Sequence, residues 1–279
     1  MNYRTAASFV ALLAAGLATP ALAQDDRSDD FDGFYISGAV GLATRASDGD
    51  DRVVFDTARD AGTDNTVTTS TGANAFSPGF CNGVSTASTR DASSCRDDDG
   101  LEYAVRLGFD KRLGNVVFGG LIEGSKSDAT DSVTAFSTTP ASYSFTRGID
   151  YAVSARARLG ITPGGGRGLM YVTGGGSYAK LDHTFTTTNT ANTFTPNNAD
   201  EMVWGWQAGG GAEILLGNNV TLGMEYLYNR YDDDKYFVAI GQGSAGATNP
   251  FVLAGGVNAR PSDTSYDFHS FRATLGFRF

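Results

Sequence analysis

The chain has 279 residues and a formal net charge of −10, from 31 acidic and 21 basic side chains. Such an acidic chain would repel a phosphate backbone instead of releasing its counterions, so we expect no nucleic-acid partner. With 41% hydrophobic and 11% aromatic residues it is too apolar for a disordered protein. No apolar run reaches the ~18 residues of a membrane-spanning helix, which excludes a helical membrane protein.

The first element has the features of a secretory signal peptide. Arg4 precedes an apolar stretch over residues 6–18 (AASFVALLAAGLA), and the small-residue triplet ALA follows at 21–23. A basic head, a short apolar middle and a small-residue end define such a signal, whereas the alternative is a buried N-terminal helix. We expect residues 1–23 to be cleaved and the exported chain to comprise residues 24–279.

The two cysteines, Cys81 and Cys95, stand in a stretch rich in Ser, Thr and Gly. Export permits a disulfide bond between them. A tetrahedral metal site needs about four ligands, and the chain has only 2 histidines. We therefore expect a disulfide that closes one loop, and neither a metal nor a cofactor.

Eight later stretches alternate between apolar and polar side chains. In LEYAVRLGFD, Leu101, Tyr103 and Val105 share one parity, whereas Glu102 and Arg106 share the other. A period of two indicates a β-strand whose two faces meet different surroundings. In chain order, the predicted strands cover residues 34–44, 101–111, 116–125, 145–161, 169–181, 203–215, 220–230 and 266–279.

The lengths of these strands and of their connections predict a membrane barrel. About ten residues suffice for a tilted strand to cross the ~25 Å apolar band of an outer-membrane barrel. Long and short connections alternate along the chain, as in barrels with long external loops and short periplasmic turns. We expect an all-β, eight-stranded antiparallel up-and-down transmembrane barrel with both termini in the periplasm; a soluble β-sandwich is the alternative.

The charged side chains on the polar parity are expected to fill the interior. The lumen of an eight-stranded barrel is just wide enough for side chains, so opposite charges should pair across it. One interpretation is a salt-bridge network that closes the barrel; the other is a narrow conduit for ions or small polar solutes. The residues assigned to the lumen are Glu102, Arg106, Asp110, Glu123, Asp150, Arg156, Arg158, Glu213, Glu225, Arg272 and Arg278.

Several of these stretches resemble a known family. SARARLGI, LMYVTGGGSYA, GWQAGGGAEILLGNNVTLGMEYLY and FRATLGFRF are similar to segments of OmpA-like β-barrel proteins, in particular the small outer-membrane surface proteins and porin-family proteins of alphaproteobacteria. The resemblance implies an outer-membrane barrel in contact with lipid and lipopolysaccharide, with its loops facing the medium. It also implies a C-terminal signal for the barrel-assembly machinery, formed by Phe271, Leu275, Phe277 and Phe279.

Histidine-based catalysis is not expected. The candidates are His183 and the pair His269 and Ser270. Neighbouring residues on a strand point to opposite faces, so His269 and Ser270 do not form a nucleophile and base pair. We therefore assign no catalytic residue.

The external segments carry two further features. Asp97–Asp99 and Asp232–Asp234 stand where strands meet loops; we interpret them as a solvated rim, with a divalent-cation contact to lipopolysaccharide phosphates as the alternative. The loops are rich in Thr, Ser, Asn, Ala and Gly, which is typical of mobile surface. The aromatic candidates for loop-mediated binding are Tyr231, Tyr236, Phe237 and Phe251.

Taken together, these patterns predict a structural or surface-exposed integral protein of the cell outer membrane, without enzymatic activity. The alternatives are a low-conductance porin for ions or small polar solutes and a loop-mediated surface binding protein. No sequence feature names a ligand.

Overall fold

The computed structural model describes residues 30–45, 52–57, 59, 65–76, 97–139 and 141–279. The expected signal peptide at residues 1–23 and the expected disulfide between Cys81 and Cys95 lie outside the described residues. Eight long strands form the barrel: β1 (Gly33–Thr44), β3 (Gly100–Leu113), β4 (Val116–Ser127), β6 (Ala141–Ile161), β7 (Gly168–Thr187), β9 (Asp200–Leu216), β10 (Val220–Asp232) and β13 (Ser265–Arg278).

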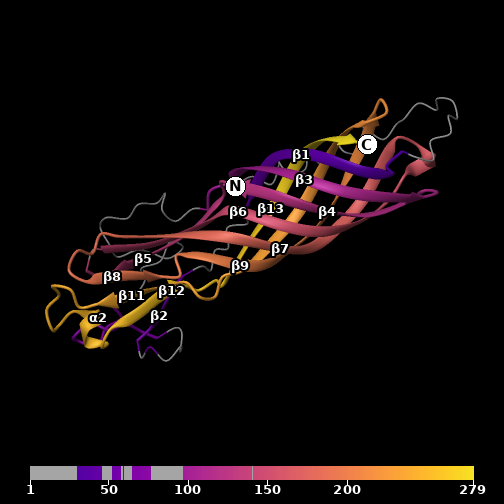
Figure 1. The fold of residues 1–279 in the computed structure, drawn as a ribbon. Helices are drawn as coiled ribbons and strands as arrows, with labels where there is room; N and C mark the ends of the chain where they lie inside the picture. The colour runs from indigo at the N-terminus through magenta and orange to yellow at the C-terminus, as the bar shows by residue number, and fades with distance from the viewer. Residues whose placement is uncertain (1–29, 46–51, 58, 60–64, 77–96, 140) are drawn as a thin grey trace.

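The eight strands close into a ring (Figure 1). Their order is β4-β3-β1-β13-β10-β9-β7-β6, and β6 pairs with β4 to complete the circle. Every one of these pairings is antiparallel. The predicted fold class, a closed eight-stranded antiparallel barrel, is confirmed.

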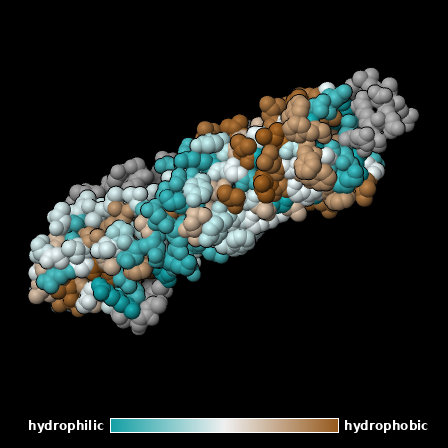
Figure 2. Space-filling view, viewed as in Figure 1, coloured by the Kyte–Doolittle hydropathy of each residue, from teal (hydrophilic) through white to brown (hydrophobic). Residues whose placement is uncertain are grey.

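Alternation along the strands separates an apolar outer face from a polar interior. Val105 is 62% exposed and Leu275 is 61% exposed, whereas Arg106 on the opposite parity of β3 is 1% exposed. Figure 2 shows the hydrophobic side chains gathered over the barrel and mainly hydrophilic ones along the middle of the molecule. Within the described part of the chain, no helix is both long and apolar enough to span a bilayer.

Short connections join the strands at one end of the barrel, which we call the turn end. Gly114 and Gly217 adopt φ values of 61° and 68° there, a conformation that glycine adopts at little steric cost. The short connection between β6 and β7 contains a 3₁₀ helix, Pro163–Gly165. The first residues of β1 and the last residues of β13 lie at the same end, since Phe279 N–H donates to the Phe34 carbonyl.

The long connections fold together at the opposite end, which we call the loop end (Figure 1). The strand β5 extends the barrel sheet beside β6, and a separate antiparallel sheet has the order β2-β12-β11-β8. The elements of the loop end are β2 (Val53–Asp56), β5 (Thr130–Ser137), β8 (Thr193–Asn197), β11 (Phe237–Gly241), the helix α2 (Pro250–Leu253) and β12 (Val257–Pro261).

The described loop-end residues have an apolar core, so the expectation of mobile surface loops is wrong for them. Phe55, Phe76, Phe145, Val238 and Val257 pack in one buried cluster. Each connection contributes only a few apolar side chains, and pairing between distant connections buries them together. The aromatic candidates for binding belong largely to the interior: Tyr231 is fully buried, Tyr236 and Phe251 are 3% exposed, and Phe237 is half-buried.

A β-bulge in β6 changes which side chains face inward. The register shifts between Ile149 and Tyr151, so Ile149 is buried whereas Tyr151 is exposed. Asp150 lies at the bulge, where its carboxylate meets Lys126 at 3.3 Å and Lys180 at 3.5 Å on the outer face. The assignment of Asp150 to the lumen is therefore wrong, because strict alternation did not allow for the extra residue.

Candidate functional site

Ten of the charged residues assigned to the lumen do lie inside the barrel, and we call them the lumen network. All of them are less than a tenth exposed, and the five acids match the five arginines in number. The members are Glu102, Arg106, Asp110, Glu123, Glu213, Glu225, Arg156, Arg158, Arg272 and Arg278.

Glu225 is the hub of the middle of the network. Arg106 approaches its two oxygens at 3.0 and 3.3 Å, Arg156 lies at 3.3 Å, and Arg272 also donates to it. The Tyr171 hydroxyl donates to the same carboxylate at 2.8 Å. Glu123 bridges the same three arginines from the other side of the lumen. Because each carboxylate faces several guanidinium groups, burial leaves no isolated charge here.

A second part of the network lies nearer the turn end. Arg158 donates to Asp110 at 2.8 Å and to Glu213 at 2.7 Å, and Arg278 also contacts Asp110. The Arg158 guanidinium also stacks on Tyr171, with 4.4 Å to the ring centroid, and on Tyr35, with 5.2 Å. These rings add cation–π attraction and fill the space beside the arginine. Tyr171 thus connects both parts of the network.

A layer of neutral polar groups follows toward the loop end. The Tyr231 hydroxyl contacts Ser177 at 2.9 Å and accepts a hydrogen bond from Gln207 at 3.3 Å. Asn229 donates to Ser270 at 2.9 Å. All five side chains are at most 3% exposed. The interior between the lumen network and the loop end is therefore also occupied by packed side chains.

A second ionic group closes the loop end, and we call it the mouth cluster. Its members are Arg45, Asp131, Arg147, His183, Asp233 and Asp263.

Arg147 is the centre of the mouth cluster. It donates to Asp131 at 2.6 Å, to Asp233 at 2.7 Å and to Asp263 at 3.3 Å. The Tyr266 ring lies 5.7 Å from its guanidinium. Sequence reasoning did not single out Arg147, which strict alternation would place on the lipid-facing parity. An arginine on that parity, in line with Ile149 and Tyr151, is the signal that could have revealed the bulge.

His183 and Asp233 form a buried pair in the mouth cluster. The His183 ring has Nδ1 3.0 Å from the Ala199 carbonyl and Nε2 3.0 Å from Asp233, and it stacks on Tyr236 with centroids 4.1 Å apart. Burial would raise the pKa of Asp233, but the hydrogen bond from His183 and the charge of Arg147 outweigh burial and lower it. Asp233 is thus not part of a solvated rim.

The pKa of Asp97, at the edge of the mouth cluster, is shifted in the opposite direction to that of Asp233. Burial, and then the neighbouring carboxylate of Asp131, raise the pKa of Asp97 to about 7. The charges of Arg147 and Arg45 hold the pKa of Asp131 below its ordinary value. Asp97 therefore changes its charge near neutral pH, whereas Asp131 stays ionised.

The other candidates have simpler surroundings. His269 lies on the outer face, 2.8 Å from the Tyr226 hydroxyl, whereas Ser270 is buried inside and accepts from Asn229. The two side chains do not meet. Among the residues that the structure describes, no group of three or more His, Cys, Asp or Glu is arranged to hold a metal ion.

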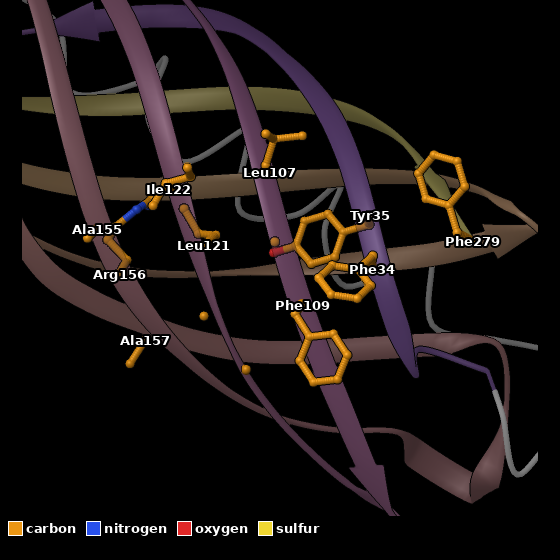
Figure 3. Close-up of a pocket in the computed structure, with 13 residues that line it drawn as sticks. Phe34, Tyr35, Leu107, Phe109, Leu121, Ile122, Ala155, Arg156, Ala157 and Phe279 are labelled. Carbon is orange, nitrogen blue, oxygen red and sulfur yellow. The ribbon is translucent and has the colours of Figure 1, made fainter.

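The outer wall has one large hollow, of about 740 Å³, over β1, β3, β4 and β6. Figure 3 shows Phe34, Leu107, Phe109 and Phe279 around it. These four side chains are all exposed on the apolar outer face. We therefore expect lipid acyl chains to fill the hollow, and we assign it no polar chemistry.

A closed barrel that is apolar outside and filled with paired charges inside is the architecture of bacterial outer-membrane proteins. The chain belongs to the family described as outer membrane protein beta-barrel domain, whose model matches residues 9–279. The family match confirms the predicted resemblance and places the protein in the outer membrane.

Two curated relatives are similar in sequence, and one solved structure is similar in fold. The 31 kDa outer-membrane immunogenic proteins of Brucella melitensis biotype 1 and Brucella suis biovar 1 are each 33% identical over 130 residues. The match covers 46% of this chain and 53% of each relative, so the chain spans about half the length of these relatives. The crystal structure of OprG from Pseudomonas aeruginosa is similar in fold, with a TM-score of 0.50, 13% identity and coverage of 91% of this chain and 99% of OprG.

Proposed function

We propose that this protein is a non-conducting integral barrel with a structural or surface-exposed role. The observation that carries the proposal is the filled interior: the side chains of Glu123, Arg156 and Glu225 are completely buried in mutual ion pairs. Opening a conduit would require several of these pairs to separate, and each stranded charge would cost several kcal/mol. The mouth cluster adds a second barrier along the same axis.

The proposed orientation has the loop end in the medium and the turn end in the periplasm. Short turns at one end and long connections at the other support it, because outer-membrane barrels keep their short turns in the periplasm. On the outer face, Lys126 lies beside Tyr103 and Lys180 lies two residues beyond Tyr178, at the level where we expect lipopolysaccharide phosphates.

The proposed assembly signal consists of Phe271, Leu275, Phe277 and Phe279. All four side chains are 45% or more exposed on the outer face of the last strand, where the barrel-assembly machinery could bind them. Deletion of Phe279 is expected to reduce insertion in cells, with little effect on the stability of refolded protein. Equal insertion of the deletion variant, measured in outer-membrane fractions, would refute this role.

Single-channel recording on refolded protein tests the non-conducting proposal. We expect the wild type to give no discrete conductance steps in planar bilayers, and Arg156→Leu to lower the thermal unfolding temperature in micelles. Discrete steps in the wild type would favour the alternative of a low-conductance porin. Unchanged unfolding of Arg156→Leu together with increased conductance would also contradict the proposal.

Loop-mediated surface binding is the second candidate function. It is favoured by the apolar core at the loop end, because a rigid scaffold can hold binding residues in place. The described loop-end segments are ordered against one another by the sheet β2-β12-β11-β8.

A further inference from the structure

A cavity of about 230 Å³ opens at the loop end. Four stretches of chain that are distant in sequence surround it: residues 75–76, the β5–β6 hairpin, the β7–β8 connection and the start of α2. The cavity lies at the part of the molecule farthest from the barrel, where Figure 1 shows β5, β8 and α2. It is smaller than the ~300–1,000 Å³ of pockets that take drug-sized ligands, so it suits one small ring.

Three aromatic rings form the floor of the cavity. The centroids of Phe76 and Tyr143 lie 5.3 Å apart, and each ring is 5.8 Å from that of Phe251. Each residue is at most 4% exposed and belongs to the loop-end core. The floor is therefore rigid and apolar, and only a small part of each ring is open to the cavity for contact with the C–H groups of a ligand.

Side-chain amides hold the rim in place. Asn189 donates to the Tyr143 hydroxyl at 2.9 Å and to Asn192 at 3.0 Å. Asn249 donates to Asn192 at 3.1 Å, and Asn192 in turn donates to the Gly241 carbonyl at 3.0 Å. These bonds join the β7–β8 connection to the start of α2, so the walls are fixed before any ligand binds.

The remaining polar groups are neutral hydroxyls. Burial raises the pKa of Tyr143, so its hydroxyl stays protonated at neutral pH; this hydroxyl accepts a hydrogen bond from Asn189 and also bonds to the side chain of Ser137. The hydroxyls of Thr139, Thr188 and Thr190 line the exposed side. None of the described residues that line the cavity is charged.

We propose that this cavity binds one neutral sugar ring, either free or as the terminal unit of a glycan. A pyranose has a face of C–H groups and an edge of hydroxyls, which match the aromatic floor and the hydroxyl-bearing rim. A sulfated or phosphorylated sugar would bring an anion to a site without a cation, at a desolvation cost. Binding of sugars from the medium rests on the proposed orientation, in which the loop end faces the medium. Sugar binding to the refolded protein does not depend on that orientation.

The test uses the full chain refolded in lauryldimethylamine oxide, because glucoside and maltoside detergents would compete. Saturation-transfer NMR and calorimetry are run with D-glucose, N-acetyl-D-glucosamine and the anionic N-acetylneuraminate. We expect at least one neutral sugar to bind with a Kd on the order of 1 mM, and the anion to show no transfer. No transfer to either neutral sugar, or equal transfer to the anion, would refute the site.

Three variants locate the binding. Ala191→Phe fills the cavity and should abolish transfer, and Tyr143→Phe removes one hydroxyl and should weaken binding about two- to tenfold. Thr195→Phe, on the exposed face of β8 outside the cavity, is the matched control and should leave the Kd unchanged. Unfolding temperatures verify that each variant folds. Wild-type affinity in both cavity variants would overturn the proposal.

Two further arms separate the ligand sources and the orientation. A soluble glycan that ends in the preferred sugar binds at least as tightly as the free sugar if the terminal unit is the ligand, and more weakly if only a free sugar fits. Labelling of Thr195→Cys in intact cells with a membrane-impermeant reagent tests the orientation. Absence of labelling would refute the proposed orientation and leave the sugar site standing.

Discussion

Arg106 on β3 and Glu225 on β10 form a two-point ion pair across the lumen, although β1 and β13 lie between their strands in the wall. The pair therefore connects opposite sides of the barrel. Backbone hydrogen bonds join only neighbouring strands, whereas this pair couples strands that share no backbone bond. The lumen network thus stabilises the closed cross-section in a way that the sheet alone does not.

Glu225→Gln is expected to destabilise the barrel by about 3–5 kcal/mol, because Arg106, Arg156 and Arg272 would lose the carboxylate that they share. Reversible urea unfolding in micelles or vesicles measures the change. The matched control is Glu201→Gln, which breaks the surface pair with Lys235 and should cost at most about 1 kcal/mol. Equal losses in the two variants would show that the network contributes no more than a surface ion pair.

Gly108→Ala is expected to destabilise the barrel by about 1–3 kcal/mol through overpacking. A β-carbon at Gly108 would overlap the Tyr35 ring, which also contacts the Arg158 guanidinium and has little room to move. Gly124→Ala is the control, since a β-carbon at Gly124 meets no atom within 4 Å. The same unfolding experiment compares them, and a stable Gly108→Ala would mean that the tyrosine relaxes freely.

The alternation of side chains was sufficient to predict the barrel and the inward charges. Arg106 and Glu225 lie on strands whose pairing has no register shift, so alternation alone predicts that their side chains point into the lumen. Counting failed at Asp150, because the bulge depends on how β6 pairs with β7, and its one local sign is an arginine, Arg147, on the parity that strict alternation assigns to lipid. The mouth cluster was missed for the same reason, since Arg147 lies beyond the bulge.

The loop-end core could not be predicted from local patterns either. Its strands have four to eight residues, which is too short for a clear period, and the strands of the separate sheet include partners that are remote in sequence. Asp56 pairs with Asn258, and Thr195 pairs with Ala239. The composition of each connection suggested mobile surface because the apolar residues are few in any one of them. Only their assembly produces a buried cluster.

Asp233→Asn is expected to loosen the loop end while the barrel persists. The substitution removes the carboxylate that both Arg147 and His183 contact, and leaves the buried Arg147 with one ionised partner fewer. Hydrogen exchange should accelerate in β8, β11 and β12 by at least tenfold, with little change in β1 and β13. Asp234→Asn, the exposed neighbour, is the control. Uniform acceleration of all strands would instead indicate one cooperative unit.

The stability of the loop end is expected to fall as the pH rises from 5 to 8. Asp97 has its pKa raised from 3.8 to about 7, so the folded state holds a proton that the unfolded chain releases. Its stabilising contribution is complete below pH ~4 and is lost as the pH rises through 7. Asp131, with its lowered pKa, has the opposite sign: its contribution is present above pH ~4 and is lost on further acidification.

Asp97→Asn isolates this contribution, because the amide does not titrate. Hydrogen exchange of the loop-end segments at pH 5 and pH 8, corrected for the intrinsic rate, should show a smaller difference in stability in Asp97→Asn than in the wild type. Asp98→Asn, which alters an exposed neighbour, should behave as the wild type does. An identical pH dependence in all three proteins would mean that Asp97 is ionised throughout this range.

Spin labels test the assignment of the outer face to lipid. Val105, Leu159 and Phe277 are 62%, 55% and 45% exposed on three different strands, and no other part of the described chain covers them. Cysteine variants at these positions, with Cys81→Ala and Cys95→Ala, should be accessible to oxygen dissolved in the acyl phase and protected from a water-soluble nickel quencher. A label at Thr195 on the exposed edge of β8 should show the reverse. Access of the nickel quencher to all three barrel positions would mean that this face meets water, and the apolar parity would then need another partner.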